Sequence, residues 1–180
     1  TVVGNNTVIR EYVTIHKGTA DRMTTKVGDN CLLMAYVHIA HDCIIGNNVI
    51  MASYAGLSGH ITIEDYAILE GNVGAQQFTT VGAHAFVAGS GQIRKSVPPY
   101  IRVAREPLQY IGVNTVGLTR RGFAKEKIQE IENIYRTIFV HNNSITKALD
   151  IVEAEMPETE VRNQIINFIR GCKDGVVKGV

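Results

Sequence analysis

The chain has 180 residues, of which 45% are apolar and 19% are charged, a composition typical of a globular protein with a core of its own. The formal net charge is +1, and no apolar run approaches the roughly 20 residues that span a bilayer. We therefore expect neither nucleic-acid binding nor stable membrane insertion. The three cysteines, Cys31, Cys43 and Cys172, lack metal or redox spacing, which favours reduced thiols in a cytoplasmic protein.

Apolar residues recur every six positions from the start of the chain. Val3, Ile9 and Ile15 open the pattern, which is already running at the first residue, so we expect earlier coils of the same repeat to be absent from this chain. The polar segment 16–26 interrupts the pattern, which then resumes in phase at Val27. We interpret the segment as an external loop, an insertion that often carries binding residues in solenoid proteins.

Two columns of side chains with a period of six follow this loop. The first contains only apolar residues: Val27, Leu33, Ile39, Ile45, Met51, Leu57, Ile63, Leu69, Ala75, Val81, Val87 and Ile93. The second, four positions later in each repeat, contains mostly small or β-branched residues: Cys31, Val37, Cys43, Val49, Ala55, Ile61, Ala67, Val73, Thr79, Ala85, Gly91 and Val97. A period of six fits neither an α-helix nor a flat strand.

The period indicates a chain that coils around a three-sided prism, with one hexad on each side. Three hexads then complete one coil, and successive coils stack about 4.8 Å apart. We therefore predict a parallel β-helix for residues 1–98. A β-sandwich with a coincidental period is the alternative, and the pattern does not fix the handedness of the coil.

The repeat ends at the Pro-Pro pair 98–99. Residues 100–123 show no repeat, and we interpret them as irregular. Helical spacing of apolar residues then predicts three helices, at about 128–138, 144–152 and 161–171. The sequence therefore predicts a connecting segment and a C-terminal α-helical subdomain in residues 99–180, packed on itself or on the end of the prism.

Polar residues from successive coils share one side of the predicted prism, and this set is His41, Gly59, His60, Gln76 and Gln77, with His38 at the adjoining corner. An imidazole titrating near pH 6.5 suits general base catalysis. Asp42 can orient His41 only if a corner bends the backbone, because neighbouring strand residues point to opposite faces. Gly59 can offer its N–H to an oxyanion. The alternative is a group of surface residues without a function.

A zinc site like that of the hexapeptide-repeat carbonic anhydrases needs three imidazoles. His38, His41 and His60 do not have the spacing of a closed site, so we predict no metal. His16 and His84 lie outside the cluster, and we interpret them as a loop residue and a surface residue.

The segment from Arg94 to Lys127 carries eight basic and two acidic residues. Such a segment favours phosphate or an acidic protein partner, and a solvated surface is the alternative. The pair Arg120 and Arg121 matches a pyrophosphate best, because paired guanidinium groups bind its oxygens.

Several motifs together resemble the bacterial UDP-N-acetylglucosamine O-acyltransferases of lipid A biosynthesis: IREYVTIHKGT (9–19), HIAHDC (38–43), GLSGH (56–60), QQF (76–78), VPPY (97–100) and GVNTVGLTRRGF (112–123). The resemblance extends over essentially the whole chain. It implies a left-handed β-helix, a homotrimer with active sites between subunits, and a location in the bacterial cytoplasm. It also implies transfer of a (3R)-3-hydroxyacyl chain from acyl carrier protein to the 3-hydroxyl of UDP-N-acetylglucosamine. No cofactor is implied beyond the carrier's phosphopantetheine.

The resemblance also implies roles for single residues. His41 matches the general base, Asp42 matches its hydrogen-bond partner, and Gly59 matches the N–H that stabilises the oxyanion. Gly89 matches the position that limits acyl-chain length, and a glycine there predicts a long chain. The substrate-binding residues by this resemblance are His38, His60, Gln76, Gln77, Asn114, Arg120 and Arg121.

The chain departs from the family at a few positions. Gln76 stands where the family often has a histidine, so we expect this residue only to bind. Val116 replaces an acidic nucleotide contact, and the segment AREPLQY (104–110) lacks a histidine that some members carry. The alternatives are the sibling N-acyltransferase of the same pathway, which lacks the GLTRRGF segment, and a non-catalytic or zinc carbonic-anhydrase-like repeat protein.

Overall fold

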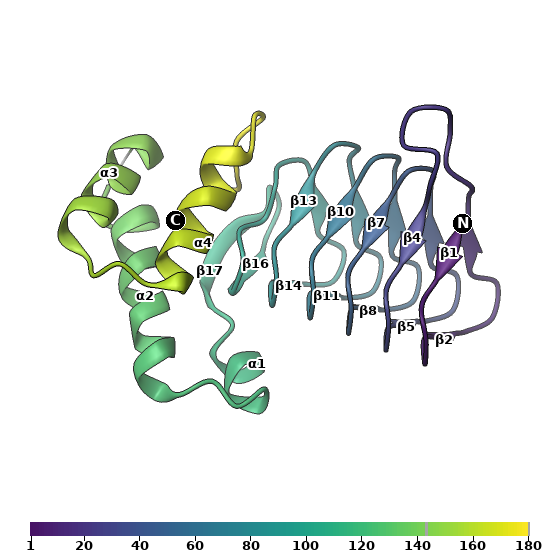
Figure 1. The fold of residues 1–180 in the computed structure, drawn as a ribbon, viewed down its shortest axis with the longest axis horizontal. Helices are drawn as coiled ribbons and strands as arrows, with labels where there is room; N and C mark the ends of the chain where they lie inside the picture. Colours follow the sequence, from purple (N-terminus) through teal and green to yellow (C-terminus); the bar gives the residue numbers. More distant parts are fainter. Residues whose placement is uncertain (143, 180) are drawn as a thin grey trace.

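The computed structural model describes residues 1–142 and 144–179. The molecule is elongated, with a β-solenoid that starts at the N-terminus and a group of helices at its far end (Figure 1). Short strands from successive coils stack into three sheets, whose strands pair in parallel within the solenoid. The predictions of a parallel β-helix and of a C-terminal helical part are both confirmed.

Each side of the prism is one sheet, and within the solenoid each sheet contains every third strand of the chain. Sheet A contains β1 (Val2–Val3), β4 (Lys26–Val27), β7 (Ile44–Ile45), β10 (Thr62–Ile63) and β13 (Thr80–Val81). Sheet B contains β2 (Val8–Ile9), β5 (Leu32–Leu33), β8 (Ile50–Met51), β11 (Ile68–Leu69), β14 (Phe86–Val87), β16 (Ile101–Ala104) and β17 (Gln109–Val113). Sheet C contains β3 (Thr14–Ile15), β6 (His38–Ile39), β9 (Gly56–Leu57), β12 (Gly74–Ala75) and β15 (Gln92–Ile93).

Both columns read from the sequence from Val27 onward are buried inside the prism. In each strand of these coils the second residue faces inward and the first faces out, as alternation along a strand requires. The six-residue period therefore follows from one inward residue on each side and one small residue beside each corner.

The corners depend on left-handed residues. Most are not glycine; Asn48, Tyr54 and His60 are examples, with φ values of 56°, 64° and 62°. Because each coil repeats the same turn, these side chains stack on their counterparts in the next coil, as Tyr36 does on Tyr54 with 4.9 Å between ring centroids. The stacking offsets part of the cost of the left-handed backbone.

The polar segment that interrupts the repeat is an external loop, as predicted. Val2 pairs with Lys26, whereas Lys26 pairs with Ile44, so the first coil contains six more residues than the next. The extra residues lie between β3 and β4 and stand away from the solenoid near the N-terminus (Figure 1).

The interpretation of residues 100–123 as irregular is wrong. The strands β16 and β17 form an antiparallel hairpin in this segment, and β16 adds to sheet B beside β14. Ile101 and Val103 face the core while Arg102 is exposed. The six-residue repeat stops here, but the sheet continues.

In the described part of the chain, four helices follow the hairpin: α1 (Thr115–Arg120), α2 (Lys125–Phe139), α3 (Ile145–Glu155) and α4 (Glu160–Gly171). The last three correspond to the predicted helices, and Ser144 caps α3 as expected. The phenol of Tyr135 on α2 is buried and donates a hydrogen bond to the carbonyl of Pro99 at 2.6 Å. One apolar core runs from the solenoid into the helices, so the helices pack on the end of the prism and on each other.

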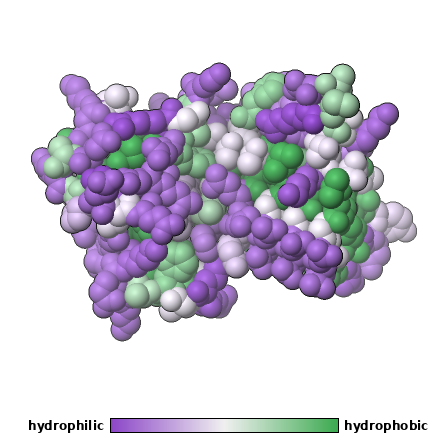
Figure 2. All heavy atoms as spheres, in the orientation of Figure 1, coloured by the Kyte–Doolittle hydropathy of each residue, from purple (hydrophilic) through white to green (hydrophobic). Residues whose placement is uncertain are grey.

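The first coil leaves apolar side chains at the surface. Val2, Val3, Val8 and Ile9 are exposed, and Figure 2 shows hydrophobic atoms gathered at the end where β1 lies. Among the described residues, no helix combines the length and apolar character needed to cross a membrane.

Candidate functional site

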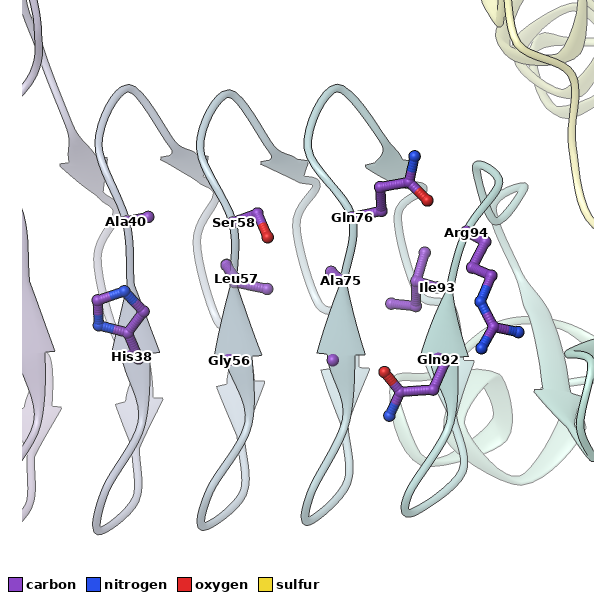
Figure 3. A pocket seen from close by; sticks show the side chains of 11 residues that line it. His38, Ala40, Gly56, Leu57, Ser58, Ala75, Gln76, Gln92, Ile93 and Arg94 are labelled. Carbon is purple, nitrogen blue, oxygen red and sulfur yellow. The ribbon is translucent and has the colours of Figure 1, made fainter.

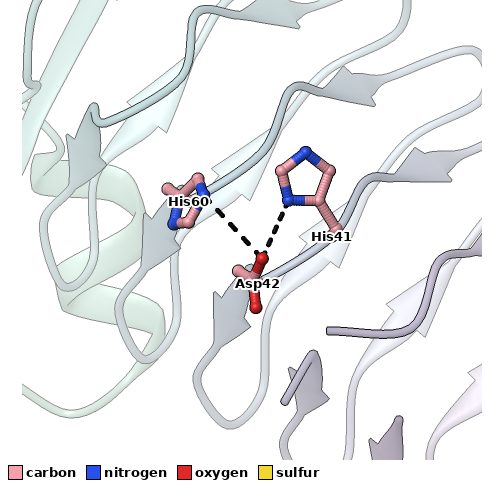
Figure 4. Close-up of side chains that lie close together, drawn as sticks. All are labelled: His41, Asp42 and His60. Carbon is pink, nitrogen blue, oxygen red and sulfur yellow. Dashed lines mark hydrogen bonds and ion pairs between the residues drawn. The ribbon is translucent and has the colours of Figure 1, made fainter. Parts of the chain in front are cut away.

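The corner between sheets C and A brings His41, Gly59 and His60 together from two successive coils. His41 follows β6, while Gly59 and His60 follow β9 in the next coil. The backbone N–H of His60 donates to the carbonyl of His41 at 3.1 Å. The rings of His41 and His60 meet edge to face, with centroids 5.2 Å apart (Figure 4).

The backbone bends at Asp42, which is the condition for a contact between the adjacent side chains of His41 and Asp42. Asp42 has a left-handed φ of 60°, so its side chain does not point to the opposite face from that of His41. The Nδ1 atom of His41 lies 2.8 Å from Oδ2 of Asp42. The Asp42 carboxylate is fully buried, while the His41 side chain is 39% exposed. The pair therefore has a hidden acidic end and an open imidazole end.

Residues of the external loop surround Asp42. Thr19 donates to the Asp42 carboxylate from its backbone N–H at 3.0 Å and from its hydroxyl at 2.6 Å. Arg22 donates to the Asp42 carbonyl at 3.0 Å, and Thr25 accepts from the Asp42 N–H at 2.8 Å. The sequence pointed to this loop but to none of these residues, because the loop has no repeat that would place them.

Hydrogen bonding keeps Asp42 ionised. Burial by itself would raise the pKa of the Asp42 carboxyl, but the hydrogen bonds from Thr19 and His41, together with neighbouring His60, outweigh it and lower the pKa to about 2. Asp42 is therefore a carboxylate at neutral pH and holds the Nδ1 side of His41.

His60 is held on several sides. Its Nδ1 atom lies 3.3 Å from a carboxylate oxygen of Asp21, and its Nε2 atom lies 3.8 Å from Asp42. Phe78 of the next coil stacks on its ring, with centroids 4.9 Å apart. These contacts fix His60 beside the His41–Asp42 pair, on the side of the following coil.

Gly59 lies directly against the imidazole of His41. A Cβ atom added at Gly59 would be 2.5 Å from Cε1 and 2.7 Å from Nε2 of His41, so only a glycine allows the ring its position. Among the described residues, the N–H of Gly59 donates no backbone or side-chain hydrogen bond, which leaves it available to an oxyanion. Gln77 follows Gly59 by one coil, as Gly59 follows His41, and is exposed at the same turn position.

The side chains of His41, Asp42 and His60 are also the set that could hold a metal ion, since their ligand atoms lie within 4.8 Å of one another. Oδ2 of Asp42 already accepts hydrogen bonds from the Thr19 hydroxyl and from His41. A metal would have to displace these partners, so the arrangement fits an oriented base better than a metal site.

A groove of about 480 Å³ runs along the outer face of sheet C, next to this corner (Figure 3). His38 and Gln76 line it together with Ser58, Gln92 and Arg94. His38 is the outward residue of β6, so the prediction that it lies at a corner is wrong. Burial and nearby His16 lower the pKa of His38. The ring of His16, at the start of the external loop, meets that of His38 with centroids 4.7 Å apart.

A second cluster occupies the corner between sheets A and B. Arg121 donates to the carbonyl of Tyr66 at 3.1 Å, and its guanidinium lies over the Tyr66 ring. His84 stacks between Tyr66 and Tyr100. Burial and the charge of Arg121 lower the pKa of His84 to about 4. His84 is therefore a half-buried residue that lies between stacked rings.

Asn114 joins this second cluster from α1. It is nearly buried, its side chain accepts from the N–H of Gly117 at 3.2 Å, and it donates to the carbonyl of His84 at 2.9 Å. Arg120, which precedes Arg121 in the chain, is exposed. Within the described residues, Nη1 of Arg121 and Nδ1 of His84 are buried and have no hydrogen-bond partner, which makes this corner a candidate for a polar ligand.

The predicted site residues thus divide among different corners of one chain. His41, Asp42, Gly59, His60 and Gln77 lie at the corner between sheets C and A, while Asn114 and Arg121 lie at the corner between sheets A and B. Gly89 lies at the third corner, where its N–H donates to Glu70 at 3.1 Å. One chain does not unite these groups into one site.

Two family models match the chain. One is described as "Udp N-acetylglucosamine O-acyltransferase; Domain 2" and matches residues 97–177. The other is described as "Bacterial transferase hexapeptide (six repeats)" and matches residues 24–59.

Several known proteins match nearly the whole chain. The acyl-[acyl-carrier-protein]–UDP-N-acetylglucosamine O-acyltransferase of Aliivibrio salmonicida is 39% identical over 98% of this chain and 68% of its own length. The protein of the same name from Pseudomonas syringae pv. tomato is 42% identical over 92% of this chain and 66% of its own length. The structure of Francisella novicida UDP-N-acetylglucosamine acyltransferase superposes with a TM-score of 0.94 at 40% identity, covering 98% of this chain and 66% of that one. The chain therefore spans about two thirds of the length of these relatives.

Proposed function

Because the chain belongs to the UDP-N-acetylglucosamine O-acyltransferase family, an acyltransferase family, we propose that it transfers a (3R)-3-hydroxyacyl chain from acyl carrier protein to the 3-hydroxyl of UDP-N-acetylglucosamine. This reaction is the first step of lipid A biosynthesis. The observation that carries the proposal is the His41–Asp42 pair, which presents an open imidazole directly against Gly59.

His41 is the general base in this mechanism. With its Nδ1–H donated to Asp42, His41 exposes a basic Nε2 that removes the proton from the sugar hydroxyl as the oxygen attacks the thioester carbonyl. Ionised Asp42 stabilises the imidazolium that forms. A positioned base of this kind typically contributes about 10²–10⁴-fold to the rate.

The remaining steps need a donor for the oxyanion and a proton for the leaving group. The N–H of Gly59 stabilises the negative oxygen of the tetrahedral intermediate. The carbon–sulfur bond then breaks, and the imidazolium of His41 returns its proton to the thiolate of the carrier's phosphopantetheine. The products are the 3-O-acyl sugar nucleotide and the free carrier thiol, so the reaction needs no cofactor of the protein.

We further propose a homotrimer in which one subunit supplies the base and its neighbour supplies the nucleotide contacts. The support is the separation of the two polar clusters, because His41 and Arg121 lie on different corners of one prism. In a trimer of parallel prisms, the corner of one subunit that carries His41 can face the corner of the next that carries Arg121. His38, His60, Gln76 and Gln77 would then contact the sugar and phosphates, with Asn114, Arg120 and Arg121 on the nucleotide.

Acyl carrier protein is the acyl donor in this proposal. The basic segment 94–127 offers exposed Arg120 and Arg102 to an acidic carrier. At Gly89, an added Cβ would lie 3.4 Å from the carbonyl of Gly71, so the position leaves room that a larger side chain would fill. We expect a long acyl chain.

We also propose a cytoplasmic location. All three cysteines are free thiols, and Cys31 and Cys43 are buried in the solenoid core. Burial raises the pKa of both thiols, so they are unreactive packing residues of the kind that a reducing compartment preserves.

A transfer assay with two alternative acceptors, offered separately, tests the proposal. The purified protein is mixed with hydroxyacyl carrier protein and with either UDP-N-acetylglucosamine or its 3-O-acylated glucosamine counterpart, and mass spectrometry identifies the product. We expect an O-acylated product from the first acceptor and none from the second. Acylation of only the second acceptor would identify the sibling N-acyltransferase. Stoichiometric zinc in the purified protein without transfer would indicate the carbonic-anhydrase type.

A further inference from the structure

The external loop reaches the site because of where it is inserted. Its extra residues lie between β3 of sheet C and β4 of sheet A, which is the corner where His41 and Asp42 lie one coil later. The loop therefore folds over the buried end of the His41–Asp42 pair and leaves the open imidazole face uncovered.

Three residues of the loop hold three different parts of Asp42. Thr19 binds the carboxylate with two donors, its N–H at 3.0 Å and its hydroxyl at 2.6 Å. The guanidinium of Arg22 binds the carbonyl at 3.0 Å. The hydroxyl of Thr25, itself fully buried, accepts the N–H at 2.8 Å. Asp42 therefore has little freedom in its backbone or its side chain.

The carboxylate needs this support because its position is unfavourable in two ways. It is buried, where an ion without partners is costly, and it sits on a left-handed residue, which L-amino acids other than glycine adopt at a cost. His41 supplies one hydrogen bond at 2.8 Å, and the shortest of the other bonds is the one from the Thr19 hydroxyl.

We propose that Thr19 is a positioning residue, which holds Asp42 ionised and directed at Nδ1 of His41 so that Nε2 faces the acceptor. The proposal rests on the proposed function of His41 as the base. Thr19 acts through Asp42 and touches neither the sugar nor the thioester. Its side chain is at the surface, so a substitution there does not open the core.

Two variants of Thr19 and one control test the role of the hydroxyl. Thr19→Val keeps the β-branched shape and removes the donor, while Thr19→Ser keeps the donor and removes a methyl group. Thr24→Val makes the same change in the same loop, where the threonine hydroxyl has no hydrogen bond among the described residues. We expect Thr19→Val to lower kcat about 10–100-fold, the range that the loss of a hydrogen bond to a charged group spans. KM for the sugar nucleotide should stay within about twofold, and Thr19→Ser and Thr24→Val should stay near wild type.

Proton NMR of the His41 Nδ1–H gives a second readout that does not depend on activity. A hydrogen bond from an imidazole to a carboxylate shifts this proton far downfield, and we expect the resonance in wild type and Thr19→Ser but a shifted or lost resonance in Thr19→Val.

A kcat for Thr19→Val within twofold of wild type overturns the proposal, as does an equal loss in Thr24→Val or a change confined to KM. Absence of transfer by the wild-type protein would instead contradict the proposed function. In that case an unchanged Nδ1–H resonance in Thr19→Val overturns the positioning role, and a changed resonance supports it.

Discussion

Replacing Gly59 by alanine tests the position of the base most sharply. The added methyl group would lie 2.5 Å from Cε1 and 2.7 Å from Nε2 of His41, whereas non-bonded carbon atoms prefer about 3.5–4.0 Å. The imidazole must therefore move by about 1 Å, and a misplacement of that size costs roughly 100-fold in rate. We expect Gly59→Ala to lower kcat by about 10²-fold, equivalent to about 2.7 kcal/mol in the activation barrier.

The matched control is Gly71→Ala. Gly71 occupies the same turn position two corners further along the chain, after β11, but an added Cβ there would lie 3.4 Å from the nearest atom, the carbonyl oxygen of Ser53, an ordinary contact. Neither glycine has a left-handed φ, so alanine introduces no backbone strain. Steady-state kinetics and thermal unfolding of both variants provide the assay. A Gly59→Ala enzyme with wild-type kcat, or an equal loss of kcat in Gly71→Ala, would show that the contact between Gly59 and His41 does not set the position of the base.

Three further predictions follow from the ionisable groups and from the division of the site between corners. The pKa of Asp42 is about 2 in the folded protein and near 3.8 when unfolded, so its contribution to stability is present above about pH 4 and is lost as the pH falls to about 2. Urea unfolding should therefore show that the difference in free energy of unfolding between wild type and Asp42→Asn decreases over that range. His84 titrates near pH 4 when folded and near 6.5 when unfolded, so stability should fall as the pH drops from about 6.5 to 4, and His84→Phe should flatten that slope in the same titration. If neighbouring subunits share each site, co-expression of His41→Ala and Arg121→Ala subunits should restore activity that neither variant has alone. Sedimentation shows whether the co-expressed subunits assemble, because the mass of the particle is then a multiple of 19.7 kDa. Assembled particles that stay inactive would place both residues in one subunit's site.

The regular part of the fold could be predicted because each coil repeats the same constraint. Each strand from β4 to β15 places its second residue inside and its first outside, so the columns that start at Val27 and Cys31 record the interior residue by residue. The stacking of His41 under Gly59 follows from the same register, because residues one coil apart lie above one another. The repeat alone is therefore enough to assign each of these residues to a coil and a corner.

The contact between His41 and Asp42 could be stated only as a condition. Adjacent residues meet when a turn changes the backbone from extended to left-handed, and aspartate is one of the residues that tolerates this conformation. The sequence places the pair at a corner but does not give the sign of φ. The structure supplies it, with φ of 60° at Asp42.

The contacts of Thr19, Arg22 and Thr25 could not be predicted because they belong to an insertion. A loop outside the repeat has no register, so its sequence does not show which residue faces Asp42. Only the interruption of the apolar pattern over residues 16–26 marks the place of the insertion in the sequence, and the strand pairs Val2–Lys26 and Lys26–Ile44 show its length.

The sequence of the β16–β17 hairpin contains an alternating pattern that a search for the six-residue period does not detect. Ile101, Arg102 and Val103 alternate between buried and exposed, the period of an ordinary strand. The end of the hexad pattern is therefore a change of period and not an end of the sheet.

Acyl transfer by His41→Ala tests the role of His41 as the general base most directly. This variant should keep the assembly and thermal stability of wild type but lose about 10²–10⁴-fold in kcat for transfer from hydroxyacyl carrier protein to UDP-N-acetylglucosamine. Transfer at a rate near wild type would contradict that role, because the geometry around Asp42 and Gly59 would then serve some purpose other than orienting a base.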